Sequence, residues 1–241
     1  MEDKKLTLVG HLDELRARVF KSLVAVIAGA TCVYIFVEKI FDSLIKPVGQ
    51  LVFIAPQEAF IARVKIAFLG GIFLALPVII YQTWRFIQDG LQPNEKRYAA
   101  LFGPVSLLFF IIGSSFGYYI IVPIGVKFLL GFATESIVPM ISVSKYISFV
   151  GLLTLVFGVV FELPLASLFL TKIGVVTPRF LSQKRRHAIV IIFIAAAIFT
   201  PPDVVTQCLL AIPLVVLYEI GLLFSRAVYK DPYANPATNS K

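Results

Sequence analysis

Six long stretches of the chain contain almost no charged residues, and this feature limits its possible folds more than any other. Only Lys21, Glu162 and Glu219 interrupt the stretches, which comprise residues 19–37, 66–84, 98–121, 146–170, 188–202 and 204–224. A backbone in lipid must satisfy its hydrogen bonds internally, which only helices and closed barrels achieve. Because the stretches lack the alternation of barrel strands, the sequence predicts an all-α integral membrane protein with six transmembrane helices.

The last two stretches are short for a membrane crossing. Each offers about fifteen residues before a charge or a proline pair, whereas a crossing takes about 20 residues. Thinning of the bilayer, or polar groups of a neighbouring subunit, could relieve the mismatch. Alternatively, the two helices extend past Pro202 and Glu219.

The overall composition excludes an ordinary water-soluble globule. Hydrophobic residues make up 59% of the 241 residues and charged residues only 15%, with a mean hydropathy of +0.90. Soluble domains carry about 25% charged residues. We therefore expect a single polytopic membrane domain over 1–241, with a cytoplasmic amphipathic arm at 1–18 and a cytoplasmic tail at 225–241.

The positive charges are distributed unevenly between the connecting segments. The N-terminal arm, two alternate loops and the C-terminal tail together carry sixteen of the 22 Lys and Arg residues. Cytoplasmic segments of membrane proteins are enriched in Lys and Arg, so we expect both termini in the cytoplasm. We therefore attribute the net charge of +8 to segments that face the inner membrane surface, and we expect no nucleic-acid partner.

The residues that usually carry metal or redox chemistry are few. Cys32 and Cys208 lie in apolar stretches, where cysteine behaves as a small hydrophobic residue. His11 and His187 lie beside charged segments, so we expect no metal site and no cofactor.

One motif suggests an enzyme, but only weakly. Residues 113–117 match the G-x-S-x-G pattern of serine hydrolases around Ser115. A serine nucleophile needs a nearby general base, and both histidines are expected at the cytoplasmic side. We expect these small residues to serve helix packing, and we expect no enzymatic activity.

Two kinds of residue within the stretches shape the expected bundle. Prolines favour kinks, and kinked helices can form a concave wall; they are Pro77, Pro104, Pro164 and Pro213. Glu162 lies deep in an apolar stretch, where a carboxylate should face a polar cavity or a partner. It could serve a proton-coupled small-solute transporter or hold helices together. Glu219, nearer the cytoplasmic end, is expected to pair with Arg226 or reach the interface.

Acidic residues also interrupt the basic cytoplasmic segments. Asp13 and Glu14 lie in the N-terminal arm and Glu95 in the loop before residue 98. In the arm, apolar residues at helical spacing predict a helix lying on the membrane surface with its charges outward. A guanidinium group pairs bidentately with a carboxylate in a way that lysine cannot copy, so these acids suit an arginine-bearing ligand.

The chain resembles the TatC family, the core receptors of the twin-arginine protein translocase. The resemblance rests on HLDELRAR (11–18), YQTWRFIQDGLQPNEKR (81–97), FELP (161–164) and FTPPDVVTQCLLAIPLVVLYEIG (199–221), in this order. It implies a receptor and scaffold that binds twin-arginine signal peptides and exports folded proteins, driven by the proton-motive force. It also implies single-span TatA-type and TatB-type partners, self-association, and a multi-pass location in the cell inner membrane.

The resemblance also assigns roles to particular residues. Glu95 resembles the main acidic contact for the arginine pair, with Glu14 and Arg16 beside it, and Arg97 and Asp89 complete the expected signal-peptide site. Asp89 stands where the family usually has proline, which adds a negative charge to the loop.

Within the membrane, the resemblance implies two further roles. Glu162 resembles the family's intramembrane polar residue. Asp203 and Gln207 match the turn and helix start near which partner subunits dock.

Overall fold

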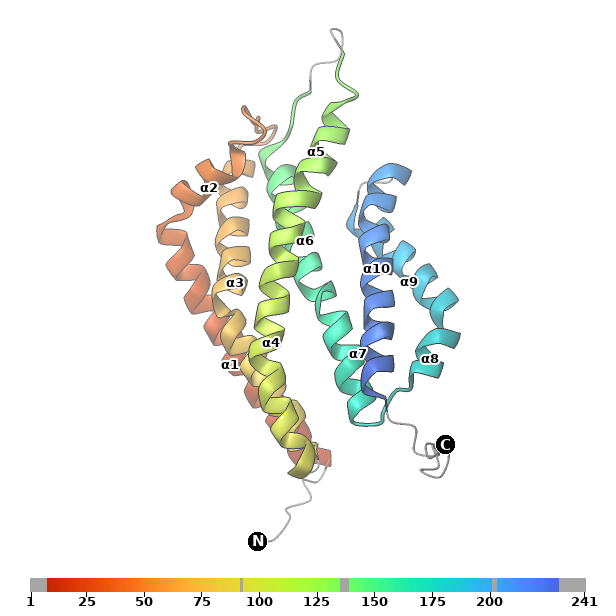
Figure 1. Ribbon diagram of the computed structural model, residues 1–241. Coiled ribbons are helices and arrows are strands. Elements are labelled where there is room, and N and C mark those ends of the chain that lie inside the picture. The colour runs from red at the N-terminus through yellow and green to blue at the C-terminus, as the bar shows by residue number, and fades with distance from the viewer. Residues whose placement is uncertain (1–7, 92, 135–138, 201–202, 230–241) are drawn as a thin grey trace, which may run out of the picture. The chain divides into compact units, whose positions relative to one another are not determined.

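The computed structural model describes residues 8–91, 93–134, 139–200 and 203–229, with the side chains of 8–9, 93–95 and 97–99 outside the description (Figure 1). The regular secondary structure of these residues is helical, apart from an isolated bridge between Val52 and Ser142. The predicted all-α fold is therefore confirmed over the described part of the chain. The chain divides into two compact units, 1–158 and 159–241, which are described separately.

The described part of the first unit contains four long helical segments and one short helix, α2. Helix α1 pairs with α3, and α4 continues through a π-helical turn, η1, into α5. Its elements are α1 (Leu8–Ile35), α2 (Val37–Ile45), α3 (Glu58–Asp89), α4 (Pro93–Phe116), η1 (Gly117–Ile121), α5 (Val122–Leu130) and most of α6 (Val143–Val160).

Helices α1 and α3 pack closely because small residues face one another at their crossing. A Cβ atom added to Gly71 would lie 2.5 Å from the backbone nitrogen of Ala30, and one added to Gly29 would lie 2.8 Å from the Gly71 carbonyl oxygen. Small residues let transmembrane helices approach at backbone distance. This crossing fixes the register between the two helices.

The small residues around Ser115 also serve packing. A Cβ atom at Gly117 would lie 3.0 Å from Cβ of Phe157, and one at Gly158 would lie 2.4 Å from Oγ of Ser114. Ser115 itself is exposed on α4. The G-x-S-x-G pattern thus lies where α4 and η1 contact α6, as the packing interpretation predicts.

The second unit is formed by α7 (Glu162–Lys172), α8 (Pro178–Gln183), α9 (Arg185–Phe199) and α10 (Val204–Val228). Helix α10 packs on α7, where the hydroxyl groups of Thr171 and Ser225 lie 2.6 Å apart in a buried hydrogen bond. A Cβ atom at Gly221 would meet Oγ of Ser167 at 2.9 Å, so this pair of helices is also in close contact.

Five helical segments of the described chain are long and apolar enough to cross a membrane. They are Gly10–Ile35, Glu58–Asp89, Ala100–Leu130, Val143–Lys172 and Val204–Val228. The last of them continues past Glu219, so α10 is longer than its charge-free stretch indicated. The remaining expected crossing, 188–202, corresponds to α9, whose 15 residues are short for a span.

The prolines that were expected to kink the helices lie within or beside helix interiors. Pro77, Pro104 and Pro213 lie inside α3, α4 and α10. Near Pro164 the helix is interrupted at Phe161, between the end of α6 and the start of α7. Proline lacks an amide hydrogen and its ring clashes with the carbonyl four residues earlier, here that of Val160.

Candidate functional site

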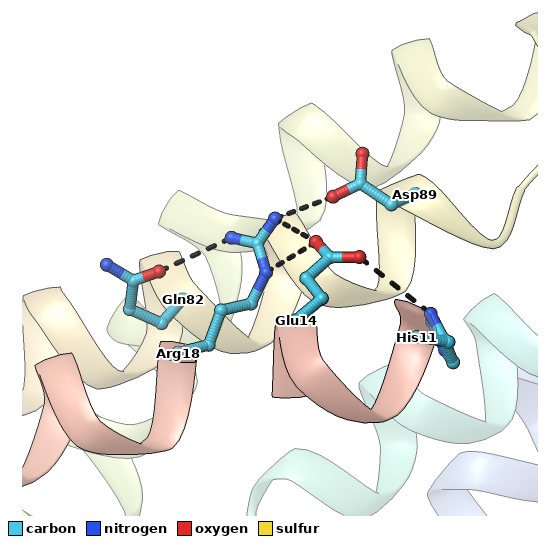
Figure 2. A network of polar contacts seen from close by, with 5 residues as sticks. All are labelled: His11, Glu14, Arg18, Gln82 and Asp89. Carbon is cyan, nitrogen blue, oxygen red and sulfur yellow. Dashed lines mark hydrogen bonds and ion pairs between the residues drawn. The ribbon is translucent and has the colours of Figure 1, made fainter. Parts of the chain in front are cut away.

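A polar cluster lies where the beginning of α1 meets the end of α3, and Arg18 is at its centre (Figure 2). Nε of Arg18 donates to Oε1 of Glu14 at 2.8 Å, and Nη2 donates to the same oxygen. Nη2 also donates to Oδ2 of Asp89 at 2.6 Å, and Nη1 donates to Oε1 of Gln82 at 3.3 Å. One guanidinium group therefore joins two carboxylates and an amide from two helices.

The spacing along each helix explains why these side chains meet. Glu14 and Arg18 are four residues apart on α1 and so share one face of the helix. Gln82 and Asp89 are seven residues apart on α3, which also places them on one face. Arg18 precedes Gly29 by the same eleven residues by which Gln82 follows Gly71, so the close crossing sets the two faces opposite each other.

His11 completes the cluster on the side away from Gln82 (Figure 2). Its Nδ1 lies 3.8 Å from Oε2 of Glu14, and its ring stacks on Phe86 with centroids 4.4 Å apart and planes inclined by 19°. The imidazole therefore lies next to both the Phe86 ring and the Glu14 carboxylate. Glu14 is thereby held between a histidine of its own helix and an arginine one turn later.

The carboxylates of the cluster are partly accessible while the arginine is largely covered. Side-chain exposure is 15% for Arg18, 20% for Glu14 and 29% for Asp89. The two carboxylates share one guanidinium group, and the positive charge of Arg85 also acts on Asp89. The carboxylates are therefore already held in an orientation that accepts a guanidinium group.

The structure brings together only part of the predicted signal-peptide site. Glu14 and Asp89 meet through Arg18, whereas Arg16 is exposed on α1. Glu95 and Arg97 lie in the first turns of α4, and their side chains are outside the described residues.

Three residues of the cluster, His11, Arg18 and Gln82, were missed by the sequence analysis. The spacing of Arg18 from Glu14 could have indicated an ion pair on one helix face. Gln82 carried no comparable signal, because its contact depends on the register between α1 and α3.

The two acidic residues within the hydrophobic stretches, Glu162 and Glu219, differ in their contacts. Glu162 is the first residue of α7 and is half-buried beside the helix interruption. Glu219 does not match the expectation of pairing with Arg226, because it pairs bidentately with Arg185 of α9. The distances are 2.9 Å from Nη2 to Oε2 and 2.8 Å from Nε to Oε1. This pair joins α9 to α10 near the end of α10.

The predicted partner-docking residues both have contacts within the chain. Oδ1 of Asp203 accepts a hydrogen bond of 2.7 Å from the amide of Thr206 and so caps α10. Nε2 of Gln207 donates to the Phe193 carbonyl at 3.0 Å, which ties α10 to α9. Beside Gln207, α9 presents an apolar groove of about 460 Å³, lined by Ile189, Val190, Phe193, Ile194, Ala197 and Ile198.

The described residues were also compared with the requirements of a metal site. No group of three or more His, Cys, Asp or Glu side chains among them is placed to hold a metal ion. The described part of the site is thus built from ion pairs and hydrogen bonds.

Comparisons with known proteins agree on one family. The family model described as "Sec-independent protein translocase protein (TatC)" matches residues 10–213. A protein of that name from Desulforapulum autotrophicum is 42% identical over 236 residues, covering 95% of this chain and 87% of the relative. One from Aquifex aeolicus is 39% identical over 232 residues, covering 92% and 95%. A crystal structure described as the twin arginine translocase receptor TatC is 39% identical, with a TM-score of 0.84 over 90% of this chain and 99% of that one.

Proposed function

Since this chain belongs to the TatC family of Sec-independent protein translocase proteins, we propose that it is the subunit that captures twin-arginine signal peptides. In this role it is a receptor and scaffold of the translocase, and folded cargo is exported with the help of partner subunits and the proton-motive force. It is a multi-pass membrane protein, and we assign it to the cell inner membrane.

The cluster around Arg18 is the observation that carries this proposal. Glu14 and Asp89 already hold one guanidinium group through charge-assisted hydrogen bonds, at 2.8 and 2.6 Å. Such bonds are about twice as strong as neutral ones. Arg18 bonds one oxygen of each carboxylate, and the other oxygens suit one further arginine, whose planar fork lysine cannot supply.

Arg18 serves the site as a positioning residue. Without it, Glu14 and Asp89 would be like charges at close range, and their side chains would separate. With it, their carboxylates are fixed on neighbouring helices, so little conformational entropy is lost when the peptide binds.

Glu95 supplies the second acidic contact in this proposal. It belongs to the first turn of α4, which follows the end of α3 after a short connection. One arginine of the pair would contact the cluster of Glu14 and Asp89, and the other Glu95. Arg16 and Arg97 would hold acidic or polar groups of the peptide and the anionic membrane surface.

Glu162, Asp203 and Gln207 serve the partner subunits in this proposal. Gln207 adjoins the apolar groove on α9, and an apolar groove with one polar residue suits a single-span helix of the TatA or TatB type. Asp203 holds the start of α10 in place for this contact. Glu162 offers a carboxylate at the α6–α7 interruption, where a polar group of a partner or a proton could be accepted.

A lone chain cannot enclose a passage wide enough for a folded protein. Translocation therefore requires several subunits, including further copies of this chain, and its own contribution is recognition and assembly. The carboxylates of the polar cluster favour recognition of arginines over the transport of small solutes, because transport of a solute does not require them.

The experiment is a titration of the purified full chain in detergent with a fluorescent twin-arginine peptide. We expect Glu95→Ala to weaken binding by about 1 to 3 kcal/mol, as for a partly buried charge pair. A peptide with two lysines should bind the unmodified chain more weakly than the twin-arginine peptide. Equal affinity for the two peptides would refute the proposed recognition of arginine, and unchanged binding by Glu95→Ala would remove that residue from the site.

A further inference from the structure

A groove between α3 and α4 is apolar along most of its length and polar at one end, as a phospholipid is. It has a volume of about 470 Å³, and its walls include Pro77, Ile80, Trp84 and Leu107, with Arg85 and Gln88 at the end of α3. Its apolar part is therefore continuous with a polar end that carries one cation.

The length of the groove corresponds to one leaflet. From Pro77 to Gln88 the helix advances eleven residues, which is about 16 Å at 1.5 Å per residue. The hydrocarbon core of a bilayer is about 30 Å thick, and a spanning helix must cover all of it. The groove thus matches the length of one acyl chain, whereas a transmembrane helix of a partner or of a second copy would extend well beyond it.

Small residues make room for the acyl chain. Gly103 lines the groove opposite Trp84, and a Cβ atom added there would lie 3.7 Å from Cδ1 of that indole, an ordinary contact. The Trp84 ring also packs against Phe102 at 5.5 Å between centroids. Tryptophan favours the membrane interface because its ring is apolar while its N–H is polar.

The charge at the polar end selects the occupant. Arg85 is exposed at this end of α3, so its guanidinium group is accessible to a lipid headgroup. The same guanidinium group pairs well with a phosphate through two parallel hydrogen bonds. We propose that this groove binds an anionic phospholipid, with its acyl chain along Ile80, Trp84 and Leu107 and its phosphate on Arg85.

Trp84 provides the readout because it is the single tryptophan of the chain. The full chain would be reconstituted in nanodiscs that contain phosphatidylglycerol or phosphatidylcholine brominated on the acyl chains, in a background of unbrominated phosphatidylcholine. Bromine quenches indole fluorescence at short range. We expect phosphatidylglycerol to reach half-quenching at about a fivefold lower mole fraction, as for one cation near an anionic headgroup.

Four variants separate headgroup recognition from general contact with lipid. Arg85→Gln should remove the preference for phosphatidylglycerol, and Arg85→Lys should retain part of it. Arg179→Gln removes the same charge from an exposed position on α8 and should leave the preference unchanged. Gly103→Leu should fill the groove and reduce quenching by both lipids.

Two results would overturn the proposal. Equal quenching by the two lipids in the unmodified chain would mean that the groove holds only exchanging bulk lipid. No quenching by either lipid would mean that protein covers the groove. Circular dichroism of each variant would verify that its helices are retained.

Discussion

Arg18 makes contacts that a lysine at the same position could not reproduce. Three of its nitrogen atoms donate to side chains on two helices, and all three donor directions lie in the plane of one rigid group. An ammonium group is a point charge on a flexible stem. It could neutralise one carboxylate but could not hold Glu14, Gln82 and Asp89 together.

We therefore expect Arg18→Lys to lower the stability of the chain and weaken peptide capture. The lost bonds to charged groups, partly exposed, should cost about 1 to 2 kcal/mol. Thermal unfolding in detergent, followed by circular dichroism, measures the change in stability. Arg179→Lys is the matched control, because Arg179 is exposed on α8 and lies outside the proposed site. Equal effects of the two substitutions would contradict the positioning role of Arg18.

Asp203 gives a second prediction at this scale, because its hydrogen bonds make helix stability depend on pH. Desolvation acts to raise the pKa of Asp203, but hydrogen bonds from the side chain and amide of Thr206 and the amide of Val205 outweigh it and lower the pKa. The cap therefore stabilises the chain fully above the unfolded pKa of about 3.9. That stability is lost as the pH falls through the lower folded pKa.

The measurement is the unfolding temperature between neutral and acidic pH. Asp203→Asn keeps a capping side chain that does not titrate, so its dependence on pH should be weaker than that of the unmodified chain. Asp203→Ala should lose about 1 kcal/mol at neutral pH, as is typical for removal of a cap. Identical acid profiles for the Asn variant and the unmodified chain would show that the carboxylate does not act as described.

The sequence predicted individual residues where the signal was local or part of a motif. The family resemblance directed attention to Glu14 and Asp89, whereas the helical spacing that relates Glu14 to Arg18 was not used. The partners of Gln82 and Glu219 depend on which helices pack together. Arg185 rather than Arg226 pairs with Glu219 because α9 lies beside α10, which no property of the α10 sequence alone indicates.

At the scale of helices, the crossing of α1 and α3 positions the polar cluster. The hydrophobic stretches predicted where these helices lie, but their relative register is set by Gly29, Ala30 and Gly71, which permit backbone contact. Pro164 likewise indicated a helix break near Phe161. Sequence patterns thus located the helices and their breaks. Which side chains meet at the site depends on how the helix surfaces pack against each other.

Gly71→Val should separate α1 from α3. Its new Cβ atom would meet the backbone of Ala30 at 2.5 Å, and backbone atoms cannot rotate away. Overpacking of this kind typically costs about 1 to 3 kcal/mol. Because Arg18 must reach Asp89 across the same pair of helices, the variant should also bind the twin-arginine peptide more weakly.

Gly103→Ala is the control for this substitution, since its Cβ atom would make only an ordinary contact at 3.7 Å with Trp84. Both variants would be compared by thermal unfolding and by peptide titration. Normal peptide binding by a folded Gly71→Val chain would show that the cluster does not depend on this crossing.

At the scale of the whole molecule, the number of crossings decides where the C-terminus lies. Within the described residues, five segments meet the length and hydropathy of a span, and α9 is a sixth, shorter candidate of 15 residues. The charge asymmetry of sixteen to six supports an even number with both termini in the cytoplasm. Helix α9 then crosses the hydrocarbon core only where the bilayer is thinned.

A reporter fused after Lys241 tests this topology in cells. We expect an enzyme that is active only in the cytoplasm to function at this position, and one placed between Phe132 and Pro139 to report an external location. A C-terminal reporter that functions only outside would mean that α9 does not cross the membrane.

The most direct test of the proposed function is a double-mutant cycle between the receptor and the peptide. Glu14→Gln in the full chain would be combined with replacement of each peptide arginine by glutamine, and all affinities measured by titration at fixed salt. If Glu14 contacts one arginine, the double change should cost less than the sum of the single changes, by about 0.5 to 3 kcal/mol. This coupling should appear with one peptide arginine and not with the other. Additive losses for both arginines would contradict recognition of the signal peptide at this cluster.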